Sequence, residues 1–99
     1  GITANMSKLL EDRAIKGKKV QMKIFAKGVS EKSSLYVKLN IRTPYASKVE
    51  EKTITLGSSW KGYELLEVEI PANTTELNLE LASGETQEIL VDGLTLNVE

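Results

Sequence analysis

The side chains best suited to bind a ligand are aromatic rings and planar polar groups. They lie at alternate positions, on the same parity, of three segments in which apolar and polar residues alternate. An aromatic ring can pack against the C–H face of a pyranose, while amide, guanidinium and carboxylate groups hydrogen-bond its hydroxyls. One more ring follows Pro44 in a loop, where binding residues are common. We therefore predict a glycan-binding set on an outer sheet face, formed by Gln21, Phe25, Tyr36, Asn40, Arg42, Tyr45, Tyr63 and Glu67.

A second interpretation of the same residues is a solvated sheet face on which Lys and Glu pair across strands. In that case a loop or a further strand covers Phe25, Tyr36 and Tyr63. Tyr45 either stands at the rim of a site or packs back onto the edge of the fold. Clustered exposed rings would favour sugar binding, whereas a ladder of Lys and Glu would favour a purely structural face.

Catalysis is not expected from this composition. The 99 residues contain no His and no Cys, which removes the commonest general base, the Ser–His and Cys–His nucleophiles, and zinc sites of the Cys type. Glu67 and Glu69 lie about 7 Å apart if they share a strand face, a spacing that inverting glycosidases use. Because such pairs occur on any acidic strand, we predict a protein that is not an enzyme.

The net charge of −1 conceals an asymmetry between the two halves of the chain. Residues 1–50 carry 11 Lys or Arg and 4 Asp or Glu, while residues 51–99 carry 2 and 10. The asymmetry indicates either a basic surface for an anionic partner or strands of the two halves that pair Lys with Glu. The second is favoured because the basic residues are spread over many elements. Nucleic acid is not expected as a partner, since the acidic half repels phosphate.

The period of the apolar residues places these side chains on strands. Alternation predicts strands over 2–6, 20–26, 35–42, 53–56, 64–70, 77–81, 88–91 and 94–98. In the fifth strand, parity places Leu66, Val68 and Ile70 inward. It places Tyr63, Leu65, Glu67 and Glu69 outward.

The remaining signals complete a fold prediction. Helical spacing predicts one short N-terminal helix or helical turn over Ser7–Ile15, closed by Gly17. Trp60, the only Trp, precedes a strand and is predicted to lie in the core or at its edge. No run of about 18 apolar residues exists, so no membrane span is expected. Together these features predict a single all-β domain over residues 1–99, an antiparallel β-sandwich.

The order of several motifs resembles the galactose-binding-like jelly roll of carbohydrate-binding modules. The resemblance rests on Gly17-Lys18-Lys19-Val20 leading to Phe25-Ala26-Lys27-Gly28, on Thr55 leading to Trp60-Lys61-Gly62-Tyr63, on Ile70-Pro71, on Leu77, Leu79 and Leu81, and on Val91-Asp92-Gly93-Leu94-Thr95-Leu96. It implies a non-catalytic module that binds polysaccharide on a concave sheet face. It also implies an extracellular or secreted parent protein with neighbouring domains. The family has a Trp at the position of Trp60, which supports a place for Trp60 in the core or at its edge.

Two departures from that family shape the other expectations. Its extra N-terminal segment has no counterpart here, which leaves a sheet edge that a homodimer or a partner's strand could cover. The family often holds a structural calcium, and of its ligands only Asp92 is matched, with Gly93 at the next acidic position. A calcium ion normally takes 6 to 8 oxygen ligands, so we predict no cofactor, and a structural calcium held in part by Asp92 is the alternative. The alternative function is a structural or protein-interaction module of a multidomain surface protein or phage-tail-like assembly.

Overall fold

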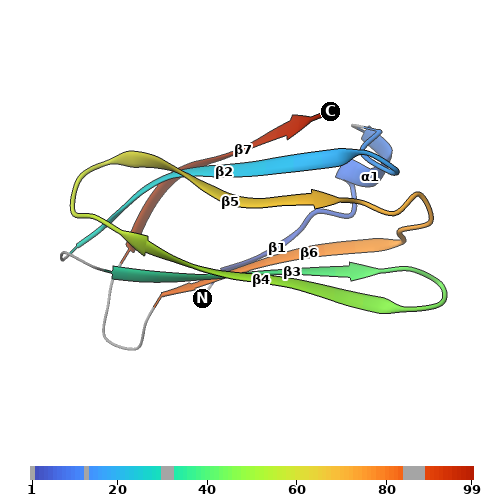
Figure 1. The fold of residues 1–99 in the computed structure, drawn as a ribbon, viewed down its shortest axis with the longest axis horizontal. Helices are drawn as coiled ribbons and strands as arrows, with labels where there is room; N and C mark the ends of the chain where they lie inside the picture. The colour runs from blue at the N-terminus through green and yellow to red at the C-terminus, as the bar shows by residue number, and fades with distance from the viewer. Residues whose placement is uncertain (1, 13, 30–32, 84–88) are drawn as a thin grey trace.

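A computed structural model describes residues 2–12, 14–29, 33–83 and 89–99. The predicted start of a strand at Glu88 lies outside these residues. Two antiparallel sheets face each other across an apolar core, which confirms the all-β prediction (Figure 1). The four-stranded sheet has the order β1 (Ile2–Asn5), β6 (Glu76–Ser83), β3 (Ser33–Arg42) and β4 (Ser47–Leu56). The three-stranded sheet has the order β5 (Lys61–Glu69), β2 (Lys19–Gly28) and β7 (Ile89–Val98).

The central strands β2 and β3 follow their predicted parity. Every second residue of each strand is buried, and the residues between them are exposed or half-buried. This period-2 alternation is what one buried sheet face requires. The inward residues are Val20, Met22, Ile24 and Ala26 on β2, and Leu35, Val37, Leu39 and Ile41 on β3.

Strand β4 begins six residues earlier than the sequence predicts. It pairs with β3 from Ser47, opposite Arg42, to Leu56, opposite Ser33. Its first part is charged and exposed, so alternation gave no signal there. An edge strand can nevertheless keep its backbone hydrogen bonds with both faces wet, and the tight turn at Thr43–Ala46 sets the register (Thr43 N to Ala46 O, 2.9 Å).

A β-bulge in β5 overturns the predicted parity of that strand. Met22 pairs with Leu66 and Lys23 with Glu64, so Leu65 is one extra residue on β5. A bulge resets the alternation at the point where it occurs. Leu65 and Leu66 are therefore both buried, and the prediction that Leu65 faces outward is wrong.

Only one turn of helix forms near the N-terminus. The helical segment α1 spans Leu9–Asp12. The sequence predicted a short helix or a helical turn within Ser7–Ile15, and only the turn forms. The amides of Leu10 and Glu11 donate to carbonyls three residues earlier, both at 3.1 Å. Isolated helices this short are unstable in water, so tertiary packing decides their length. Ala14 has a φ of 49°, which is left-handed and ends the segment.

The two halves of the chain lie side by side and pair opposite charges. Lys19 of the basic half meets Glu67 of the acidic half at 2.7 Å, and Arg42 meets Glu76 at 3.3 Å. This agrees with the favoured interpretation of the charge asymmetry. Within the described part of the chain, no helix is both long and apolar enough to cross a bilayer.

Candidate functional site: a polar groove on the four-stranded sheet

The predicted site residues are divided between two opposite surfaces. Because the core lies between the sheets, the outward side chains of each sheet point away from those of the other. Tyr36, Asn40 and Arg42 lie on the outer face of the four-stranded sheet, and Tyr45 lies in the turn at the end of β3. Gln21, Phe25 and Glu67 lie on the outer face of the three-stranded sheet. One cleft formed by all eight residues is therefore ruled out.

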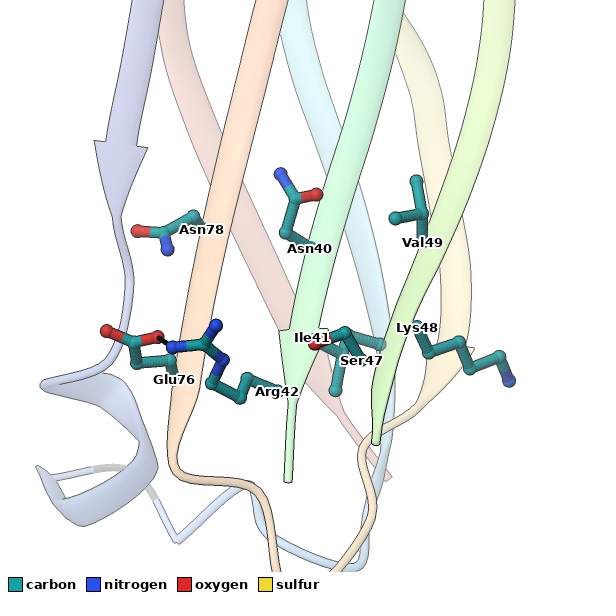
Figure 2. Close-up of a pocket in the computed structure, with 8 residues that line it drawn as sticks. All are labelled: Asn40, Ile41, Arg42, Ser47, Lys48, Val49, Glu76 and Asn78. Carbon is teal, nitrogen blue, oxygen red and sulfur yellow. Dashed lines mark hydrogen bonds and ion pairs between the residues drawn. The ribbon is translucent and has the colours of Figure 1, made fainter. Parts of the chain in front are cut away.

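A groove on the four-stranded sheet contains two of the predicted residues, Asn40 and Arg42 (Figure 2). Its volume is about 230 Å³. Register explains why its residues meet: Asn40 lies opposite Asn78 of β6 and Val49 of β4. The next row outward along β3 places Arg42 opposite Glu76 and Ser47. The groove residues are Asn40, Ile41, Arg42, Ser47, Lys48, Val49, Glu76 and Asn78.

The polar groups of the groove are held by contacts that water can replace. Arg42 donates to Glu76 at 3.3 Å, and the two side chains point toward one another in Figure 2. Asn40 donates from Nδ2 to Glu80, also at 3.3 Å. Exposed ion pairs of this kind contribute little stability, typically about 0–1 kcal/mol. A ligand could therefore take over these hydrogen bonds at small cost to the fold.

Two aromatic side chains lie on the same strand and its turn, outside the groove itself. Tyr36 is half exposed and precedes Asn40 by four residues, roughly 13 Å along an extended strand. Tyr45 is 91% exposed in the turn that follows Arg42. The groove thus has a ring beyond it in each direction along β3. Between Tyr36 and Asn40, Lys38 lies opposite Glu80 on one side and Glu51 on the other.

The outer face of the three-stranded sheet has a different composition. Phe25 stacks on Trp60, with ring centroids 5.6 Å apart and planes 7° apart. The Lys27 ammonium lies 5.4 Å from the centre of the Trp60 ring. Trp60 is 43% exposed and is not among the residues packed in or against the core, so its predicted position in the core or at its edge is wrong. It lies beside Phe25 on the outer surface of the three-stranded sheet, in the connection just before β5.

Tyr63 does not belong to either outer face. The bulge at Leu65 turns Tyr63 inward, and the half-buried ring packs against the core. Its hydroxyl accepts a hydrogen bond from the Gly57 amide at 2.9 Å. These contacts tie the β4–β5 connection to the sheet, so Tyr63 has a structural role and the prediction that it faces outward is wrong.

Glu67 is held by a neighbouring lysine. A hydrogen bond from Lys19 and the positive charge of that ammonium lower the pKa of Glu67, and a hydrogen bond from Gln21 adds to the effect. The same hydrogen bond and charge raise the pKa of Lys19. Glu67 is therefore a carboxylate at neutral pH, and its Oε1 is engaged by the Lys19 ammonium. This arrangement is that of a surface ion pair.

Removing the lysine partner should return Glu67 to ordinary titration behaviour. In Lys19→Met, we expect the pKa of Glu67 to rise toward its usual value, measured by NMR titration of the side-chain carboxyl. Because the folded-state pKa is lowered, any stability from this pair exists above the usual carboxyl pKa and is lost as pH falls through the folded value. Lys23→Met on the same strand is the matched control, and an equal shift there would contradict the assignment.

Asp92 lies exposed at a second irregularity, where Gly93 pairs with Phe25 and Val91 with Ala26. It is the only residue that the family resemblance offered as a metal ligand. No group of three or more acidic, His or Cys side chains suited to a metal ion occurs among the described residues. The described donors therefore do not fit the calcium site that the family resemblance implied.

Six groove residues were missed by sequence reasoning: Ile41, Ser47, Lys48, Val49, Glu76 and Asn78. Asn78 had the usable signal, since it alternates with Leu77 and Leu79 and so faces outward. What the sequence did not contain was the register that places Asn78 beside Asn40. Scans of protein-family models, characterised proteins and solved structures find no match to this chain.

Proposed function

We propose that the domain is a non-catalytic glycan-binding module that uses the groove on its four-stranded sheet. The observation that carries this proposal is the shared row of Asn40 and Asn78, with Arg42 and Glu76 beside it, lining one concave surface. Planar amide, guanidinium and carboxylate groups offer the paired donors and acceptors that sugar hydroxyls require.

A glycan chain would lie along β3, where polar groups and rings follow one another. Asn40 and Asn78 would hydrogen-bond hydroxyls inside the groove, while Val49 supplies an apolar wall. Tyr36 and Tyr45 would pack against sugar rings on either side of it. Gln21, Phe25 and Glu67 are on the opposite surface and have no part in this site.

The wider setting belongs to the same proposal. The order of motifs supports kinship with galactose-binding-like jelly rolls, in which the module is one part of a larger extracellular or secreted protein. Neighbouring domains would then act on the polysaccharide that this domain holds. The proposed role needs no metal and no catalytic residue.

A structural or protein-interaction module is the second candidate, and one observation favours it. Lys38 lies between Glu51 and Glu80 in adjacent strands of the four-stranded sheet. Such rows of opposite charge are typical of a sheet face that is only solvated. In that function the groove would remain filled with water.

Comparing the two outer faces tests the proposal. We expect binding on a glycan array and retardation in gels that contain the polysaccharide identified there. Tyr36→Ala should weaken this binding on the order of tenfold, because it removes one stacking surface. Phe25→Ala makes the same type of change on the opposite face and should leave the affinity unchanged.

Two outcomes would contradict the proposed site. Loss of binding in Phe25→Ala with none in Tyr36→Ala would move the glycan to the three-stranded sheet. Absence of binding to every polysaccharide by the folded protein would favour the structural module.

A further inference from the structure

Strand β7 has one unpaired edge. Among the described strands it pairs only with β2, along Ile89–Val98, and it ends the three-stranded sheet (Figure 1). The backbone groups on its other side therefore have no strand partner in the described part of the chain. An edge of this kind is a template on which a further strand can add.

Apolar side chains are exposed on both faces of this strand. Val91 and Leu94 pair with the buried Ala26 and Ile24, so they belong to the core face, yet they are 37% and 39% exposed. Leu90 pairs with Lys27 on the outer face and is 46% exposed. A protein surface docked on one face would cover only one of these sets. A strand hydrogen-bonded to the edge would place side chains beside both.

The other long edge strands are protected against such pairing. The β4 edge carries Lys48, Glu50, Glu51 and Lys52 within six residues. The β5 edge has three glutamates and the bulge at Leu65. Charges and bulges are the usual means by which natural sheets prevent edge pairing. Strand β7 also has an irregularity, at Asp92. It differs from β4 and β5 in charge, because it has no Lys, Arg or Pro and Asp92 is its one charged residue.

We propose that β7 is a docking edge for an extended segment of another protein, which adds as a fourth strand to the three-stranded sheet. Its alternate side chains would be apolar and would cover Val91 and Leu94. The charges at the β7 edge restrict which residues the added segment can have. Asp92 and the nearby Glu99 are acidic, and β7 has no cation. The segment is therefore neutral or basic at the positions that face them.

Charge also argues against a second copy of this chain as the occupant. In an antiparallel pair of two β7 strands centred between Thr95 and Leu96, Asp92 of one copy would lie directly opposite Glu99 of the other. This contact would occur twice, at both ends of the pair. Like charges at close cross-strand positions destabilise a sheet.

A synthetic peptide tests the edge directly. The probe has ten residues that alternate valine and threonine, with an added lysine at each end. We expect NMR amide shifts confined to β7 and its neighbours, and slower hydrogen exchange of β7 amides. A peptide of the same length with proline at two central positions should bind at least tenfold more weakly, because proline cannot donate to the ladder.

Two lysine variants provide the matched comparison. Leu94→Lys places a charge on the apolar edge and should weaken peptide binding at least tenfold. Val49→Lys, at a comparably exposed position of the β4 edge (46% against 39% for Leu94), should leave peptide binding unchanged. If Leu94→Lys does not fold, Leu94→Thr keeps the β-propensity and should still weaken binding severalfold.

Three results would overturn the proposal. The first is the absence of β7 shifts at millimolar peptide, and the second is equal binding of the proline peptide. The third is a dimer in sedimentation that Leu94→Lys disperses, which would assign the edge to a second copy. The glycan groove lies on the other sheet, so glycan affinity should be the same in Leu94→Lys, and failure of either proposal can be recognised separately.

Discussion

Leu65→Ala is expected to lower the free energy of unfolding by about 2–5 kcal/mol. The side chain is fully buried because the bulge directs it into the core beside Leu66. A loss of this size is a large share of the roughly 5–15 kcal/mol that stabilises a typical domain. Urea unfolding followed by circular dichroism measures it.

Leu90→Ala is the matched control for that experiment. It makes the same change at an exposed position of β7, so its effect should stay within about 0.5 kcal/mol, as at other surface sites. Equal losses in the two variants would contradict the position of the bulge. Without the bulge Leu65 would face outward, and Leu65→Ala would then cost little stability. A small effect of Leu65→Ala would therefore also contradict the bulge.

The double substitution Asn40→Ala and Asn78→Ala is expected to remove most of the proposed glycan affinity. If each amide makes one net hydrogen bond to the sugar, the pair contributes about 2 kcal/mol, or roughly 30-fold in affinity. Isothermal titration with the polysaccharide fragment found on the array measures this loss. Both side chains are only half-buried, so the free energy of unfolding should change little.

The control for this double substitution lies on the opposite face. Gln21→Ala removes an amide of the three-stranded sheet and should not alter the affinity. If Gln21→Ala weakens binding while the double variant does not, the groove is not the site. If the double variant unfolds at a much lower urea concentration, its loss of binding reflects unfolding. The glycan affinity of the single variant Asn40→Ala then tests the site.

The two proposals concern different surfaces and different parts of the fold. The groove depends on side chains from β3, β4 and β6 and on the register between them. The docking edge depends on the backbone and side chains of β7 alone. A protein that uses both would hold a glycan on one sheet while another chain extends the other sheet.

The sequence by itself determined the all-β architecture and most of the core. Alternation assigned the inward residues of β2 from Val20 to Ala26 and of β3 from Leu35 to Ile41 correctly, because a strand's side chains alternate with a period of two wherever pairing is regular. It also placed Tyr36, Asn40 and Arg42 on one outward face, and these residues do share one. Of the two interpretations of the charge asymmetry, the favoured one, pairing between the basic and acidic halves, agrees with the ion pairs of Lys19 with Glu67 and of Arg42 with Glu76.

Only the tertiary structure decided which outward faces coincide. Parity states that Phe25 and Tyr36 both point outward, but it does not state that β2 and β3 belong to different sheets. One extra residue at Leu65 reversed the side on which Tyr63 lies. Asn78 met Asn40 through a register set by pairing across 38 residues of chain. Local periodicity reports how each strand is buried, whereas a binding site depends on long-range pairing that no single segment encodes.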